Sequence, residues 1–527
     1  MKSNDNEKYS FNFFRATLFQ HIRTKLFNRM GRITTGEWSN AYMLPNGEDE
    51  FYALRWSGGR LIGNYQVSKH NDRKAVGKGR IKLQAAQSVA NFEGLRVIDG
   101  NLICFLSDVK EGKNTFYMQK YSKELIPEGG AVELASYSIE KGMKRGWFDI
   151  RMSSSEEFFA IVWEVPGRKN RNDVYGFKIF NTKMELINDG EYPLPFSSNL
   201  SKIHEHHISN NGEYFLAVTE YSEPERKRYF TNRLDYKSLH IFHIAEDGLQ
   251  DFELRFKGNR VDALAMSSDT NGIFTITGLY GSRDDNAVTG IFHQLVNVET
   301  GSVLNEGFQE FDPEFIVQGW TDRQKRKANR RQNNGRGAPQ LYNYSMRDAI
   351  LMPDGSLVGT MEQYYVQVST TTNGQTGQTT NTYFYYYNDI IAYKINSTGE
   401  FDWIKKIRKY QVSQNDGGPY SSYESFIDGG KVYFIFNDNV RNYSESGEFI
   451  DTDYLYTANY SKKRNVVAIA EIDLKTGESS RKTFFDRSEV EALAVPKLFD
   501  VNYEYGKMLL YTVWGRKEKI GVLNFKD

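Results

Sequence analysis

The chain of 527 residues has almost no cysteine and no excess of charge. Its single cysteine, Cys104, excludes an intramolecular disulfide and a zinc site built from paired cysteines. The 67 Lys and Arg residues balance the 67 Asp and Glu residues, which excludes a generally basic nucleic-acid binder and an acidic tail protein. No stretch approaches the roughly 18 apolar residues of a membrane-spanning helix. A Walker loop and a G-x-S-x-G elbow are also missing, which counts against several large enzyme classes.

Aromatic residues are abundant, at 14% of the chain, and many lie in a repeated unit. The unit is an apolar run, a turn of Asn, Asp, Ser or Gly, and a second apolar run. Eight copies occur, at residues 42–56, 95–109, 148–165, 206–221, 263–280, 349–365, 425–438 and 497–514. A second hairpin follows, as at 292–304, 390–407 and 467–484, so a repeat contains four strands.

This repeat predicts an all-β fold, a β-propeller of four-stranded antiparallel blades. The copies recur first every 53 to 60 residues and later every 75 to 83. A blade needs about half of the roughly 100 residues of a sandwich domain, so the spacing favours blades. We expect eight blades over residues 38–527, with seven as the alternative. Because the last copy ends after its third strand, we expect residues 1–37 to supply the missing strand and close the ring.

Residues 11–30 are the one strongly helical stretch, because Phe11, Phe14, Leu18 and Ile22 recur at helical spacing. This short basic helix packs on the propeller flank in one interpretation. In the other it lies on a membrane surface or in a partner's groove. No export signal is recognisable, so we expect either a cytoplasmic protein or a mature form whose export sequence has been removed.

Three insertions enlarge consecutive repeats, at 312–345, 366–389 and 439–463. The first carries a basic run that is either a site for phosphate or an acidic protein, or a solvated helix or loop. The second is expected to be a long hairpin with a Gly/Thr/Gln-rich tip. The tyrosines of the second and third either form a recognition surface or cover blade edges. The residues singled out for contact with a partner are Trp320, Arg323, Arg326, Tyr385 and Tyr386.

Polar residues expected on inner strands are the candidate ligand-binding residues of the channel. His204 and His206 are expected to share one face of a strand, where they either bind a metal with a third ligand or line the channel. Arg347, Asp348 and Glu424 are expected on neighbouring repeats. The two carboxylates either do acid–base work or neutralise the arginine in a structural ion network. No metal site, cofactor or catalytic residue is assigned.

Residues 385–438 resemble uncharacterised β-propeller proteins of the Bacteroidota cell envelope. The resemblance rests on Lys-Ile-Asn at 394–396, Gly399, Trp403 and the Asn-Asp-Gly-Gly turn at 415–418, and it covers the sixth and seventh repeats. Such proteins are generally exported to the periplasm or cell surface, and some are accessory subunits of outer-membrane secretion assemblies. The resemblance implies the same location and role, although the chain departs from it in lacking an export signal.

The leading hypothesis from the sequence is a non-catalytic scaffold that binds another protein, as an accessory subunit of a cell-envelope or protein-secretion assembly. The insertions are expected to meet the partner, with an outer-membrane protein as one candidate. We expect a monomeric subunit of a hetero-complex, with no nucleic acid and at most peripheral membrane contact. It would lie in the periplasm or cell envelope as a mature form and in the cytoplasm otherwise. The alternative is an enzyme or lectin directed at carbohydrate or peptide at the channel mouth.

Overall fold

The protein is an all-β propeller. The computed structural model describes residues 39–525 except for 59–62, 72–73, 86–87, 141–144, 166–171, 224–233, 246–247, 255, 257, 270–271, 284–285, 299, 335–337, 462, 487–491 and 515–516. The sheets of these residues are antiparallel, and eight of them have at least four strands. The predicted fold class is therefore confirmed, whereas the number of blades stays a prediction.

The first four sheets come from the first half of the chain. The first contains β1 (Ser39–Pro45), β2 (Glu50–Gly58), β3 (Gly63–Asn71) and β4 (Lys74–Arg80). The second contains β7 (Asn91–Ile98), β8 (Asn101–Lys110), β9 (Lys113–Tyr121) and β10 (Pro127–Ser138). The third contains β11 (Trp147–Met152), β12 (Phe158–Val165), β13 (Asn172–Asn181) and β14 (Leu186–Ser197). The fourth contains β15 (Ser201–Ile208), β16 (Tyr214–Ser222), β17 (Asp235–Ala245) and β18 (Gly248–Leu254).

The other four sheets follow in chain order. The fifth contains β19 (Asn259–Ser268), β20 (Ile273–Ser282), β21 (Gly290–Asn297) and β22 (Ser302–Glu310). The sixth contains β23 (Tyr344–Leu351), β24 (Leu357–Thr372), β25 (Thr379–Ile395), β26 (Phe401–Ile407) and β27 (Gln411–Gln414). The seventh contains β28 (Tyr423–Asp428), β29 (Lys431–Asn439), β30 (Asn465–Asp473) and β31 (Ser479–Asp486). The eighth contains β32 (Leu493–Ala494), β33 (Asp500–Asn502), β34 (Lys507–Trp514) and β35 (Lys517–Asn524).

A few short elements lie between the sheets. They are the strand pair β5 (Gln84–Ala85) and β6 (Ser88–Val89), the 3-10 turns η1 (Ser198–Leu200), η2 (Val440–Asn442) and η3 (Pro496–Leu498), and the helices α2 (Pro313–Val317) and α3 (Asp322–Asn333). Among the helices of the described residues, none is long and apolar enough to cross a membrane.

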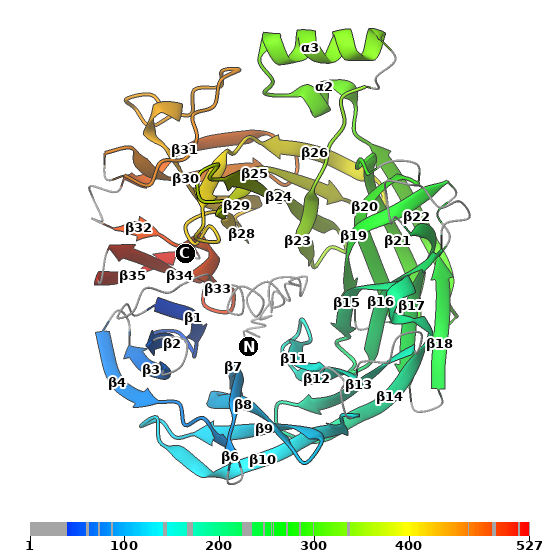
Figure 1. The fold of residues 1–527 in the computed structure, drawn as a ribbon, viewed down its shortest axis with the longest axis vertical. Coiled ribbons are helices and arrows are strands. Elements are labelled where there is room, and N and C mark those ends of the chain that lie inside the picture. Colours follow the sequence, from blue (N-terminus) through cyan, green and yellow to red (C-terminus); the bar gives the residue numbers. More distant parts are fainter. Residues whose placement is uncertain are drawn as a thin grey trace, which may run out of the picture.

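The sheets stand around a centre, with the first strand of each nearest the middle and the last at the rim (Figure 1). In the eighth sheet β32 and β33 both pair with β34, and β35 lies on the other side of β34. Within the described residues this sheet is therefore three strands deep, as its sequence indicates. The expected closing strand and the N-terminal helix fall in residues 1–37, which lie outside the described residues.

The core consists of apolar clusters, each shared by two neighbouring sheets. Phe105 of the second sheet packs near Phe159 of the third, and Phe177 of the third stacks on Tyr214 of the fourth. Both faces of a sheet are buried, so inner strands such as β16 are apolar along most of their length rather than alternating.

The same packing closes the ring between the first and eighth sheets. One cluster joins the two sheets, and it consists of Met43, Phe51, Ala53, Val495, Leu509 and Tyr511. At its edge the Lys507 ammonium lies 2.7 Å from the Asp49 carboxylate. The ends of the described chain are thus held by the same face-to-face burial that joins every other pair of sheets.

The three insertions leave the ring at the edge where the inner strands begin, which we call the entry edge. Residues 312–343 precede the inner strand β23, and the β24–β25 and β29–β30 connections lie beside the starts of β23 and β28. The first and third insertions lie together, because Arg408 donates both to Asp451 at 3.0 Å and to the Gly319 carbonyl at 3.4 Å, and Lys325 lies 4.0 Å from Asp453. The extra surface is therefore gathered on one sector of the ring, as the sequence predicts.

Truncation of the closing contact should destabilise the whole ring. We expect Phe51→Ala, at a side chain only 2% exposed, to lower the free energy of unfolding by about 3–5 kcal/mol, because it removes a ring and leaves a cavity. Urea unfolding followed by circular dichroism measures this change. Val303→Ala, at a residue 42% exposed, is the control and should change stability by less than about 0.5 kcal/mol. Equal effects for both variants would contradict closure by this cluster.

Candidate functional site

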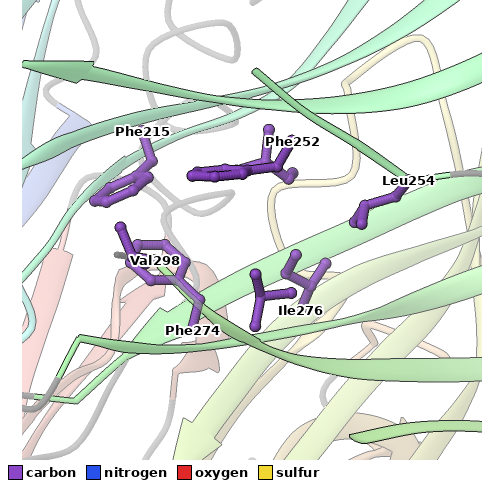
Figure 2. A pocket seen from close by; sticks show the side chains of 8 residues that line it. Phe215, Phe252, Leu254, Phe274, Ile276 and Val298 are labelled. Atoms are coloured by element: carbon purple, nitrogen blue, oxygen red, sulfur yellow. The ribbon is translucent and has the colours of Figure 1, made fainter. Parts of the chain in front are cut away.

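A cavity between the fourth and fifth sheets is too small and too apolar to be the site (Figure 2). Its volume is about 10 Å³, the size of roughly one water molecule. It is lined by Phe215, Ile241, Phe252, Leu254, Phe274, Ile276, Val296 and Val298. With no polar side chain in the lining, this cavity is a packing defect of the core.

The two candidate histidines do not share a face of their strand. The register of β15 against β16 shifts at His204, which breaks the alternation of side chains there. His204 bonds to the Thr219 hydroxyl at 2.7 Å, whereas His206 bonds to the Tyr214 hydroxyl at 2.5 Å. Thr219 and Tyr214 are five residues apart on β16, so they face opposite sides. The prediction that His204 and His206 point the same way is wrong, and the register shift is the reason.

The basic run of the first insertion forms the exposed helix α3. Thr321 caps the helix through a capping box with Gln324, and none of the helix residues is buried. Arg323 and Arg326 are therefore on a solvated helix face, one of the two interpretations of this run, and Trp320 before the helix is half-buried. Their role in partner contact stays a prediction.

Three of the predicted channel residues come together between the sixth and seventh sheets. Arg347 and Asp348 are on β23 and Glu424 is on β28, and all three are at most 5% exposed. The Ser425 hydroxyl donates to Asp348 at 2.8 Å, across the two sheets. The Arg347 guanidinium lies 5.4 Å from the centre of the Tyr423 ring.

Arg347 and the carboxylates around it stabilise one another's charged forms. Burial opposes the charge of Arg347, but the carboxylates of Glu362, Asp348 and Glu424 and the Tyr423 ring outweigh it and raise the pKa of the guanidinium. The structure thus joins the predicted residues with Glu362, which the sequence did not single out. A lone acid inside the apolar run 357–362 was the available signal.

Glu362 forms a fully buried ion pair with Lys409. The Lys409 ammonium donates to Glu362 Oε1 at 2.8 Å, to the Tyr387 carbonyl at 2.8 Å and to Gln411 Oε1 at 3.1 Å. The second carboxylate oxygen of Glu362 accepts from the Ser422 hydroxyl at 2.7 Å. Burial opposes the ionisation of Glu362, but Lys409 and Arg347 outweigh it and hold its pKa below the usual value.

Lys497 lies at the entry edge beside this ion pair. It belongs to η3, ahead of the inner strand β33, and it is half-buried. Its ammonium donates to the Gly418 carbonyl at 2.6 Å and lies 3.9 Å from the centre of the Tyr387 ring. Burial lowers the pKa of Lys497 to about 7; the carboxylates of Glu362 and Asp416 oppose this lowering, whereas the positive charges of Arg347 and Lys409 add to it.

The turn over Tyr387 requires glycine. Gly418 has a positive φ of 67°, and a Cβ on it would lie 2.6 Å from the Tyr387 ring. The amide of Gly418 donates to the Asp416 carboxylate at 2.9 Å, which holds the turn in place. This Asn-Asp-Gly-Gly turn therefore presents its carbonyl to Lys497 and brings an acid within range of the amine.

We call Arg347, Glu362, Lys409, Asp416 and Lys497 the Lys497 cluster. Arg347, Glu362 and Lys409 come from the sixth sheet, Asp416 from the turn that leads to the seventh, and Lys497 from the 3-10 turn η3 of the eighth. A lysine with a pKa near 7 exists in both protonation states at neutral pH, which suits a general acid or base. Clusters of this kind are typical of functional sites, because burial and neighbouring charges shift the pKa of a group that is still accessible.

No protein-family model matches the sequence, and a search of curated proteins finds no significant match. Solved propellers do match in fold. The apocarotenoid oxygenase of Synechocystis is 10% identical, with 93% of this chain and 87% of that chain covered and a TM-score of 0.34. The α-L-arabinanase of Penicillium chrysogenum is 12% identical, with 67% and 92% covered and a TM-score of 0.30. The WD40 domain of SCAP from fission yeast is 8% identical, with 100% and 97% covered and a TM-score of 0.37.

These likenesses concern the fold, and no residue role passes from them to this chain. Several of the matched structures are enzymes, and they include a polysaccharide lyase, a dipeptidyl peptidase and a prolyl oligopeptidase. This finding contradicts the leading hypothesis of a non-catalytic scaffold in a secretion assembly.

Removal of one partner of the buried ion pair should be costly. We expect Glu362→Gln to lower the free energy of unfolding by about 3–5 kcal/mol, because Lys409 is then buried without its counter-ion. Urea unfolding at pH 7 measures the loss. Glu471→Gln breaks the more exposed pair with Lys431 and should change stability by less than about 1 kcal/mol.

The free energy of unfolding of the wild-type protein should also depend on pH, because Glu362 takes up a proton at low pH. The folded pKa of Glu362 lies below its usual 4.5, so its contribution is complete above pH 4.5 and is lost as the pH falls through the lowered value. The stability gap between the wild type and Glu362→Gln should therefore narrow as unfolding is measured at pH 6, 5, 4 and 3. A gap that stays constant over this range would contradict the lowered pKa.

Proposed function

We propose that the protein acts on a carbohydrate at the Lys497 cluster, with Lys497 as the group that exchanges a proton with the substrate. The observation that carries this proposal is the position of the amine. It lies at the entry edge, between the Gly418 carbonyl and the face of the Tyr387 ring, with a pKa near neutrality. Charged groups of the sixth sheet act on this amine, and a group whose pKa lies near the working pH is suited to proton exchange.

The side chains around Lys497 suit a sugar. Tyr387 and Tyr364 have ring centres 4.6 Å apart, and Tyr420 and Tyr460 have ring centres 5.7 Å apart. The Tyr460 hydroxyl bonds to the Ser421 hydroxyl at 2.8 Å, next to the glycine turn. Aromatic faces pack against the C–H face of a sugar ring, while hydroxyl, amide and charged groups bond to its hydroxyls.

Carbohydrate chemistry also explains the mixture of charges. The accessible members of the cluster are a cation, Lys497, which can donate to a sugar hydroxyl, and a carboxylate, Asp416, which can accept from one, so the pair does not select a ligand of one charge. In this proposal Asp416, whose charge acts on Lys497, is the second member of the acid–base pair.

Replacement of the amine should abolish turnover. We expect Lys497→Met to lower the rate of glycan cleavage by about 100-fold or more, because it removes the proton-exchanging group and keeps the length of the side chain. Release of reducing ends from a panel of oligosaccharides measures the rate, and peptide substrates form a second panel. Lys475→Met, at an exposed lysine away from the cluster, is the control and should leave the rate unchanged.

The rate should rise with pH through about 7 if Lys497 acts as the base. The amine is protonated below its pKa of about 7 and becomes a base above it. Loss of this pH step in Lys497→Met would support the role. Cleavage of peptides but not glycans would contradict the substrate class, and glycan binding without turnover in the wild type would identify a lectin.

A further inference from the structure

Beyond the start of β23, the hairpin of β24 and β25 carries no charge, and its lower part pairs with β27 through Phe384–Tyr387. Pairing of β23 with β24 stops at Gln363, after which only β25 continues beside β24. Residues 363–388 contain no Asp, Glu, Lys or Arg, although these residues make up 25% of the chain. An uncharged segment of this length at the entry edge is set apart from the rest of the surface.

One face of this hairpin is aromatic, and it is exposed beyond Tyr387, which is buried at its base. The pairing runs without a shift from Tyr364 opposite Tyr387 to Thr372 opposite Thr379, so alternate residues share a face. We call one of the two faces the tyrosine face, and it consists of Tyr364, Val366, Val368, Tyr383, Tyr385 and Tyr387. Tyr364, Val368 and Tyr383 are 38%, 49% and 40% exposed.

The tyrosine face leads directly to the Lys497 cluster. Tyr387, at its base, lies under the Lys497 ammonium at 3.9 Å and beside Tyr364 at 4.6 Å. Tyr385 and Tyr383 follow at spacings of about 6.6 Å along the strand. On the reverse face Tyr365 and Tyr386 stack at 4.6 Å, which stiffens the hairpin. The rings therefore form a continuous row from the hairpin down to the amine.

We propose that the tyrosine face holds sugar units of a neutral polysaccharide whose reacting unit lies at the Lys497 cluster; this inference rests on the proposed function. Tyrosine rings offer flat apolar faces with few rotatable bonds, so they bind sugar rings at low entropic cost. The absence of charge in residues 363–388 gives a polyanion no ionic partner there. A chain of neutral sugars has no charge to desolvate when it binds this face. Its sugar rings can follow the row of tyrosines toward the Lys497 cluster.

The test compares long and short sugars. Soluble xyloglucan, galactomannan, arabinan and β-glucan serve as neutral probes and polygalacturonate as the anionic probe, in affinity gel electrophoresis with the full chain. We expect at least one neutral polymer to retard the protein, and the double substitution Tyr383→Ala with Tyr385→Ala to weaken that binding by about tenfold or more. The disaccharide of the same polymer should bind the double variant and the wild type equally. Tyr454→Ala, at a tyrosine 61% exposed in another insertion, is the matched control and should bind the polymer like the wild type.

The outcomes separate this inference from the proposed function. Unchanged polymer binding in the double variant, or a preference for polygalacturonate, would overturn the tyrosine face as the glycan-holding surface, even if Lys497→Met abolishes turnover. Weakened polymer binding in the double variant supports the inference, even where Lys497→Met keeps full turnover and the role of that amine fails. No retardation of the wild type by any of the polymers, neutral or anionic, would overturn both.

Discussion

Burial of both faces of every sheet is the constraint on which the rest of this structure depends. A strand such as β16, apolar along most of its length, cannot leave one side in water, so each sheet needs a neighbour on each side. The chain meets this need by packing consecutive sheets face to face and by placing the eighth against the first. The faces of the sheets are therefore buried against one another, and polar groups that must contact a ligand lie at strand ends and in connections.

In the Lys497 cluster, charged side chains are buried within this packing. Lys409 and Glu362 are buried together and form an ion pair. Lys409 also donates to Gln411, and Glu362 also accepts from Ser422, so both side chains stay charged. Lys497 is at the edge of the same group and has the carbonyl of Gly418 rather than a direct carboxylate partner for its amine. Burial is not fully offset there, and the pKa of Lys497 falls to about 7 as a result.

The entry edge carries two surfaces of different character. The charged cluster lies where the sixth, seventh and eighth sheets meet, and the uncharged tyrosine face rises beside it. Tyr387 belongs to both, since its carbonyl accepts from Lys409 and its ring lies under Lys497. A single strand therefore connects buried charge with an exposed aromatic surface, and this juxtaposition is the basis of the function proposed for the protein.

The sequence by itself determined the repeat, the four-stranded antiparallel sheets, the long hairpin at 366–389 and the clustering of the insertions, because strand and turn signals are local and recur along the chain. It also placed Arg347, Asp348 and Glu424 on inner strands. It did not show the roles of Glu362, Lys409 or Lys497, which are distant in the chain and meet only when the sixth sheet has formed and the eighth sheet lies near it. It also missed the register shift at His204, since strand register depends on the partner strand. Packing between sheets decides which charges are desolvated, and desolvation is what separates a reactive lysine from an ordinary one.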